Sequence, residues 1–311
     1  MEKGAFRLDL NFQFHDLSKL VHGDDYVSFA ELAVRSPEAA EHGDAEFRVF
    51  RIDTIARYAL TDLTELSLAV PYQRITIRVD ENDEHHRNET VDGLGDLRVG
   101  MRHFVAFEQS YQVSILVGLS LPTGRLNRVT AASYLGHDEA GDLGVIVPPH
   151  SHLQLGTGTV DPFLGLDGVF RFDGHWMFLG SVNATIPLYE NRYDYRTAPS
   201  ATFTLGPAVR VGHTRLILGL YAETFWSGRD RFDGADVVGP GGVFDGSFGV
   251  PNTGRFEIAL RPTLTWGITD HLTLNVAGRI PLYTRIRESA DKGDVQLTED
   301  FGLFVGLSYN F

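Results

Sequence analysis

The last twelve residues of the chain, DFGLFVGLSYNF, alternate between apolar and small or polar side chains, apart from Phe304. Counted back from Phe311, every second residue as far as Phe301 is apolar. Successive side chains of a β-strand point to opposite faces, so this segment predicts a strand with one wholly apolar face. Any fold for this chain must therefore place that face against other apolar groups, up to the terminal residue.

The same alternation recurs along the whole chain of 311 residues. Apolar residues at every second position predict about twelve strands. These strands are expected in residues 6–14, 50–60, 66–72, 97–107, 113–121, 164–172, 176–188, 203–211, 216–223, 256–266, 272–282 and 300–311.

The connections between these segments alternate in length. Short turns are expected at residues 61–62, 108–110, 173–174, 212–213 and 269–270, and long loops near 15–45, 73–93, 123–158, 189–200, 227–254 and 284–298. Outer-membrane barrels combine strands of about ten residues, an even strand number, short periplasmic turns and longer outside loops. The sequence therefore predicts one all-β domain over residues 1–311, a transmembrane antiparallel up-and-down β-barrel in the bacterial outer membrane.

A soluble β-sandwich or lipocalin would show the same alternation. We favour the membrane barrel because lysine is scarce and the polar face carries Arg, Asp, Asn, Ser, Thr and Gly, which suit a narrow aqueous lumen. No run of about 18 apolar residues predicts a transmembrane helix. The chain enters a strand directly, so we expect an export signal to have been removed before Met1.

Charge and composition exclude several other classes. The formal net charge is −14 and no block of basic residues occurs, which argues against a nucleic-acid partner. The chain has no cysteine, so it has neither disulfides nor thiolate metal ligands. No cofactor and no catalytic motif is predicted.

Three segments carry a family resemblance: GLGDLRVGMRHF (93–104), SILVGLSLPTG (114–124) and LGTGTVDPFLGLDGVFRF (155–172). They resemble the central pattern of the outer-membrane family named for the MetA pathway of phenol degradation. This resemblance implies a transporter or channel for aromatic or other hydrophobic compounds. The C-terminal residues Phe311, Tyr309 and Leu307 also resemble the signal that the bacterial barrel-assembly machinery reads.

Charged residues on the polar face are the candidate lining of the lumen. They are Arg51, Arg57, Arg98, Arg102, Arg171, Arg210, Arg215, Arg261 and Arg279, interleaved with Asp53, Asp96, Asp161, Asp167, Glu223, Glu257 and Asp300. One interpretation is structural, because cross-strand ion pairs would fill and stiffen a narrow lumen. The other is an arginine-lined path that attracts anionic solutes.

Four further stretches of the sequence bear on possible sites. Residues 79–92 are acidic and could offer Asp80, Asp83 and Glu84 to calcium or His85 and His86 to a transition metal, but we favour a solvated loop without metal. The Gly-rich stretch at 233–246 is expected to be a flexible loop. Residues 27–34 and 144–156 are expected to control access to the barrel mouth.

The sequence favours a channel or transporter for small molecules, with the outer-membrane bilayer, the assembly machinery and a small solute as its partners. The alternative is a barrel that does not transport and serves a structural or binding role. A lipid-modifying enzyme is the third possibility, and it would require a catalytic role for His103 on the apolar face. The oligomeric state is not determined by the sequence.

Overall fold

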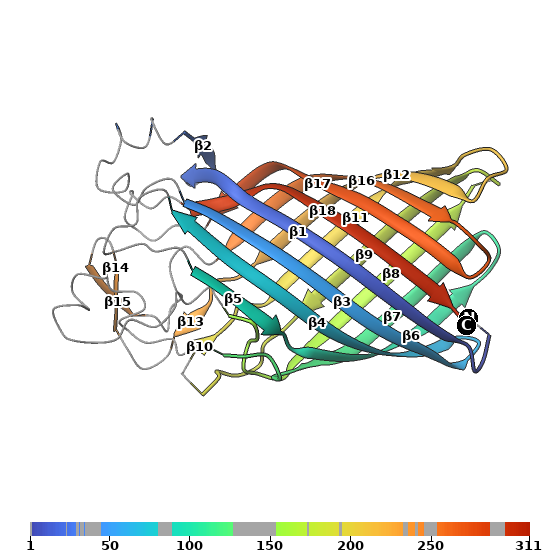
Figure 1. The fold of residues 1–311 in the computed structure, drawn as a ribbon, viewed down its shortest axis with the longest axis horizontal. Coiled ribbons are helices and arrows are strands. Elements are labelled where there is room, and N and C mark those ends of the chain that lie inside the picture. Colours follow the sequence, from blue (N-terminus) through green and yellow to red (C-terminus); the bar gives the residue numbers. More distant parts are fainter. Residues whose placement is uncertain are drawn as a thin grey trace.

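The computed structural model describes residues 2–22, 24–28, 31, 34, 45–79, 89–126, 154–172, 174–192, 195–232, 236–239, 242–245, 254–286 and 296–311. These residues form a closed β-barrel whose strands are strongly tilted (Figure 1). Both chain ends lie at the end of the barrel where the turns are short (Figure 1). No helix in the described ranges is long and apolar enough to cross a membrane.

Twelve strands of the described chain form the wall, and they follow one another around the ring in sequence order. They are β1 (Phe6–His22), β3 (Ala45–Thr61), β4 (Thr64–Val79), β6 (Leu97–Phe107), β7 (Tyr111–Leu121), β8 (Asp161–Arg171), β9 (Trp176–Thr185), β11 (Ser200–Arg210), β12 (Leu216–Ser227), β16 (Arg255–Gly267), β17 (Leu272–Ile286) and β18 (Gln296–Asn310). All neighbouring pairs are antiparallel, which confirms the predicted twelve-stranded barrel.

Six shorter strands supplement the wall. Two of them extend the sheet, since β2 (Asp25–Val27) pairs with β1 and β5 (Glu89–Leu94) pairs with β4. The other four form two separate pairs, β10 (Tyr195–Arg196) with β13 (Arg231–Phe232) and β14 (Asp236–Gly239) with β15 (Gly242–Asp245).

The barrel closes where the last strand meets the first. Leu8 on β1 is paired with Tyr309 on β18, and the register continues as far as Val21 opposite Gln296. The Phe311 amide donates a hydrogen bond to the Phe6 carbonyl over 2.9 Å, and the two rings lie 5.3 Å apart. The terminal residues therefore complete a ladder that leaves no free sheet edge at this seam.

The wall carries large apolar side chains on its outer face. Leu66 and Met101 are register partners on β4 and β6, and their side chains remain 42% and 41% exposed. Leu68 and Val99, the next outward pair, are 42% and 37% exposed. A contiguous apolar surface of this kind is unfavourable in water but is the outer band expected of a barrel in lipid.

Inward positions are kept small where neighbouring strands approach closely. A Cβ atom added to Gly206 on β11 would lie 2.2 Å from the Leu220 carbonyl oxygen. At Gly118 on β7 it would lie 2.3 Å from the Val99 carbonyl oxygen. Both obstacles are backbone atoms, so these positions accept only glycine without a shift of the strand.

Candidate functional site: the barrel lumen

The polar faces of the strands line the inside of the barrel. The register brings inward residues of neighbouring strands side by side: Asp53 is paired with Asn11, Asn11 with Gly306, and Gly306 with Asn275. Because side chains alternate strictly along each strand, this ring of polar and small residues continues along the lumen.

A cavity of about 550 Å³ lies between opposite walls of the lumen. Asp167 and Ser181 contribute from β8 and β9, and Asn11 and Asn275 contribute from β1 and β17. Since β8 and β17 are far apart around the ring, the described side chains leave space across the full width of the barrel at this level.

Aromatic side chains also border this cavity. Tyr221 and Phe304 line it from β12 and β18, beside the guanidinium of Arg261. The central carbon of that guanidinium lies 4.7 Å from the centre of the Phe304 ring. The cavity therefore offers aromatic faces, a fixed positive charge and neutral hydrogen-bonding groups.

Most of the predicted inward charges form ion pairs. Arg51 contacts Asp53 at 2.8 Å and Arg102 contacts Asp167 at 2.7 Å. Arg57 contacts Asp9 at 2.6 Å. The pairs Arg57–Asp9 and Arg102–Asp167 join different strands, whereas Arg51 and Asp53 lie two residues apart on β3.

Arg279 is the centre of the largest charged cluster. Its Nε donates to Glu223 over 2.7 Å, and its Nη2 donates to Glu257 over 2.8 Å. Its Nη1 donates to Glu299. The Arg279 side chain is 6% exposed, and the three carboxylates are 7%, 2% and 7% exposed in the same order. One buried cation therefore pairs with three buried anions. A second cation, Arg261, contacts Glu223 at 2.7 Å.

Two members of this cluster, Glu299 and His15, were not among the predicted lining residues. His15 Nδ1 lies 2.9 Å from Glu299 Oε1. Strict alternation back from Phe311 selects Asp300 instead, but a β-bulge shifts the register between Asp16 and Leu17 on β1. In the structure Glu299 joins Arg279, and Asp300 contacts Lys19 at 2.6 Å.

Arg98 differs from the paired arginines. Its guanidinium carbon lies 4.3 Å from the centre of the Phe163 ring. Among the residues that the structure describes, no carboxylate lies within ion-pair distance of Arg98. Its positive charge is therefore held by an aromatic face on the inner wall rather than cancelled by an acid.

The remaining predicted arginines lie toward the short turns. Arg171 donates to Gln112 over 3.2 Å, and Arg210 ends β11 as an exposed residue. Arg215 precedes β12 and contacts Asp270 in the neighbouring turn between β16 and β17, where both side chains are more than half exposed. The structure thus places Arg215 at the rim rather than in the cavity.

A segment between β7 and β8 leans against the inner wall. The buried carboxylate of Asp96 accepts hydrogen bonds from the amides of Gly124 and Thr157 over 2.9 and 2.7 Å, and from the Thr157 hydroxyl over 3.1 Å. Asp161 accepts from the Thr159 hydroxyl over 2.5 Å, and it also lies 2.8 Å from the Thr157 hydroxyl, whose single proton it shares with Asp96. Two buried aspartates therefore hold this connection in place.

Apolar packing supports the same contact. Leu155 is 3% exposed and packs against Ile75 on the extension of β4, next to Phe47 and Val91. The Gln73 side-chain amide donates to the Leu155 carbonyl over 2.8 Å. Gln73 is the register partner of the inward residue Arg51, so the described part of this connection lies on the inner face at the mouth.

One carboxyl group beyond the end of β12 is perturbed by burial. Burial raises the pKa of Asp230 above its ordinary value, although hydrogen bonds from the Tyr195 hydroxyl and the Ala198 amide oppose the rise. A carboxyl with a raised folded-state pKa contributes less stability as the pH rises through that pKa.

We expect the contact between the Asp230 and Tyr195 segments to loosen as the pH rises above about 4, the ordinary pKa of an aspartate. Asp230→Asn removes the titrating group and should flatten this change. The measurement is hydrogen exchange at the Ala198 amide, compared between the two proteins at each pH. An identical pH dependence in both proteins would contradict the assignment.

Several expected sites lie wholly or partly outside the described residues. They are the acidic residues and histidines at 80–88, residues 29–30 and 32–33 of the stretch 27–34, residues 144–153, and residues 233–235, 240–241 and 246 of the Gly-rich stretch. No group of three or more His, Asp or Glu that could hold a metal ion occurs in the described part of the chain. His103 Nδ1 lies 3.0 Å from the Thr64 hydroxyl on the neighbouring strand.

Comparison with known proteins gives a structural likeness without a sequence match. No protein-family model and no curated protein matches the chain. The COG4313 outer-membrane channel of Pseudomonas putida F1 is similar over 100% of this chain and 97% of its own, with 15% identity and a TM-score of 0.66. A FadL homologue of Pseudomonas aeruginosa is 12% identical, over 100% of this chain and 90% of its own, with a TM-score of 0.41. The β domain of the Bordetella autotransporter BrkA is 11% identical, over 99% and 100%, with a TM-score of 0.48.

The likeness to the Pseudomonas putida protein concerns the fold. It confirms the outer-membrane barrel that the resemblance to the MetA-pathway family implies. Together with the outward apolar face, it places the protein in the bacterial outer membrane.

Proposed function

We propose that the protein is an outer-membrane channel that passes small molecules through its lumen. The observation that carries this proposal is the cavity of about 550 Å³ between opposite walls of the barrel. Sites for small ligands commonly measure about 300–1,000 Å³, so the space suits a small solute. The similar fold of a protein described as an outer-membrane channel supports the same role.

The lining of the cavity suggests the class of solute. Tyr221, Phe304 and Leu179 offer apolar and aromatic surface, while Thr204 and Asn275 offer neutral hydrogen-bonding groups. Such a mixture favours small compounds with an aromatic or hydrophobic body and few polar atoms. Arg261 is paired with Glu223 at 2.7 Å, so at this level it contributes its contact with the Phe304 ring rather than an uncompensated charge.

The rival proposal is a sealed barrel with a structural or partner-binding role. The buried cluster around Arg279 supports it, because tightly paired charges occupy part of the lumen. Conductance of the purified protein in planar lipid bilayers separates the two proposals. Discrete current steps support the channel, and a bilayer that stays silent with folded protein present favours the sealed barrel.

Arg98→Ala is expected to lower the preference of the open pore for anions. No described carboxylate cancels the charge of Arg98, so the substitution removes one net positive charge from the lumen. A unit charge changes the energy of an ion about 4 Å away in water by about 1 kcal/mol, which corresponds to about a fivefold change in relative permeability. The measurement is the reversal potential across a salt gradient.

Arg285→Ala is the matched control for this experiment. Arg285 is exposed and is the register partner of Phe256, on the face opposite to the inward residue Glu257. Its removal subtracts the same charge outside the lumen and should leave the reversal potential unchanged. Equal shifts in the two variants would show that the selectivity arises elsewhere.

A further inference from the structure

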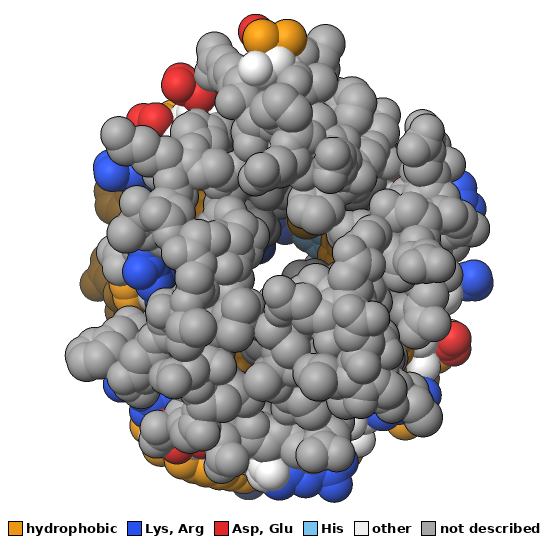
Figure 2. Space-filling model, turned by 90° about the vertical axis from the view of Figure 1, so that its left-hand side faces the viewer, with side chains coloured by type: hydrophobic (Ala, Val, Ile, Leu, Met, Phe, Trp, Pro, Cys, Tyr) orange, Lys and Arg blue, Asp and Glu red, His pale blue; other side chains and the backbone are white. Residues whose placement is uncertain are grey.

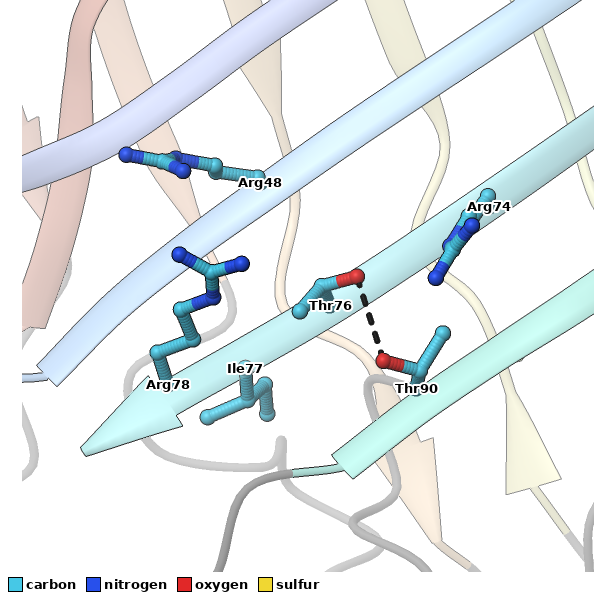
Figure 3. A pocket seen from close by; sticks show the side chains of 6 residues that line it. All are labelled: Arg48, Arg74, Thr76, Ile77, Arg78 and Thr90. Atoms are coloured by element: carbon cyan, nitrogen blue, oxygen red, sulfur yellow. Dashed lines mark hydrogen bonds between the residues drawn. The ribbon is translucent and has the colours of Figure 1, made fainter.

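The outer face of the barrel carries a basic recess above its apolar surface. The recess has a volume of about 330 Å³ and is lined by Arg48, Arg74, Arg78, Thr76 and Thr90, together with Ile77 (Figure 3). We call it the arginine recess. The guanidinium groups come from β3 and β4, and Thr90 comes from β5, which here extends the sheet beside β4 (Figure 3).

The register shows that the arginine recess faces away from the lumen. Arg48 is paired with Thr76, and Arg74 is paired with Phe50, whose side chain is 38% exposed on the outer wall. The intervening residue Ile75 points inward and packs against Leu155. A solute inside the barrel therefore does not reach these guanidinium groups.

The three arginines are not equally compensated. Arg48 contacts Glu46 and lies 3.3 Å from Asp16. For Arg74 and Arg78, the described part of the chain provides no carboxylate within ion-pair distance, and both side chains are exposed. Arg74 has Asp92 as its register partner on β5, but Asp92 accepts its hydrogen bond from Tyr72 and forms no ion pair with Arg74. Arg74 and Arg78 therefore flank two hydroxyl groups without a direct ion pair to a described acid, and Thr76 and Thr90 lie 3.3 Å apart through their Oγ1 atoms.

The position of the arginine recess relative to the apolar outer surface indicates which part of the membrane it contacts. Tyr72, two residues before Arg74 on β4, is outward and 37% exposed. At about 3.3 Å per residue along a tilted strand, Arg74 and Arg78 lie within about 5–20 Å of that aromatic residue. Both are on the side of the long connections (Figure 1), where the headgroups of the outer leaflet begin.

Basic residues are also visible elsewhere around this end of the barrel. Figure 2 looks along the barrel axis from the side of the long connections, and Lys and Arg side chains appear at several points of its rim. The arginine recess differs from an isolated rim charge because three guanidinium groups and two hydroxyls border one hollow, and two of the three make no ion pair with a described acid.

We propose that the arginine recess binds the phosphate groups of the glycolipid in the outer leaflet. Guanidinium groups bind phosphate oxygens through paired, charge-assisted hydrogen bonds, and the threonine hydroxyls can donate to the same oxygens. The acyl chains of such a lipid then lie along the apolar wall beneath the recess. The interaction is independent of whether the lumen conducts.

The test is binding of bisphosphorylated lipid A to the purified, folded barrel in detergent, measured by native mass spectrometry. Arg74→Ala with Arg78→Ala should weaken binding at least about tenfold, because charge-assisted contacts to phosphate are lost. Arg285→Ala removes one outward arginine from β17 and should change binding less than either single substitution in the recess. Folding of every variant is verified by the heat-dependent shift of the barrel on gels.

Two further ligands separate the contribution of the phosphate groups from the contribution of the acyl chains. Lipid A without phosphates should bind the unaltered protein as weakly as bisphosphorylated lipid A binds the double variant. Inorganic phosphate at equal concentration should not displace the lipid, because it cannot use the apolar wall. The proposal is overturned if the double variant binds bisphosphorylated lipid A normally, if removal of the phosphates has no effect, or if inorganic phosphate competes equally.

Discussion

Replacing Arg279 with methionine is expected to destabilise the folded barrel by about 3–5 kcal/mol. The substitution leaves the carboxylates of Glu223, Glu257 and Glu299 without their shared cation, while each side chain stays less than a tenth exposed. Removal of one partner from a buried ion pair costs this much because the remaining charge is desolvated and uncompensated. The measurement is the free energy of unfolding in urea from lipid vesicles.

The matched variant combines Arg279→Met with glutamine at the three glutamate positions. This variant removes the orphaned charges and should recover most of the lost stability. If the lumen conducts, Arg279→Met alone should also increase the preference of the pore for cations. The combined variant should suppress that increase. If the protein with Arg279→Met alone is as stable as the unaltered protein, water already reaches and screens the cluster.

Asp96→Ala is expected to release the connection between β7 and β8 from the inner wall. Three hydrogen bonds to a buried carboxylate are lost, and the amides of Gly124 and Thr157 lose their acceptor. Hydrogen bonds to charged groups contribute about 1.5–3 kcal/mol each, so the loss of two of them should raise the frequency of local opening about 100-fold or more. Hydrogen exchange at those two amides measures the effect.

The same substitution has an expected functional result. Because Leu155 and Thr157 lie on the inner face of the mouth, their release should enlarge the conductance of the channel. Asp92→Ala is the control, since Asp92 lies on the adjoining strand β5 but accepts a hydrogen bond from the exposed Tyr72. Faster amide exchange without a change in conductance would show that this connection does not limit the passage of ions.

The barrel itself was predictable from the sequence because one physical rule governs every strand. A residue in an antiparallel wall points either to lipid or to the lumen, so apolar alternation identifies both faces at once. The inward position of Glu223, Glu257 and Arg279 follows from this rule. Their convergence does not, because it depends on the exact register between neighbouring strands, which the alternation of side chains leaves open.

Two parts of the lumen escaped prediction for identifiable reasons. Glu299 replaces Asp300 in the charged cluster because a bulge breaks the period of two, and the sequence gives no signal of its position. Asp96 is predicted on the polar face, but its partners are backbone amides of a connection without periodicity. Contacts of that kind depend on the path of the chain rather than on a residue pattern.

The seam between β1 and β18 also constrains the order of events during biogenesis. Leu8 and Tyr309 are neighbours in space but lie at opposite ends of the polypeptide. A nascent chain still missing its final strand has two open sheet edges, and neither can be saturated in hydrocarbon. The barrel can therefore close in the membrane only after β18 has been synthesised, and until then its unpaired edges are open to aggregation.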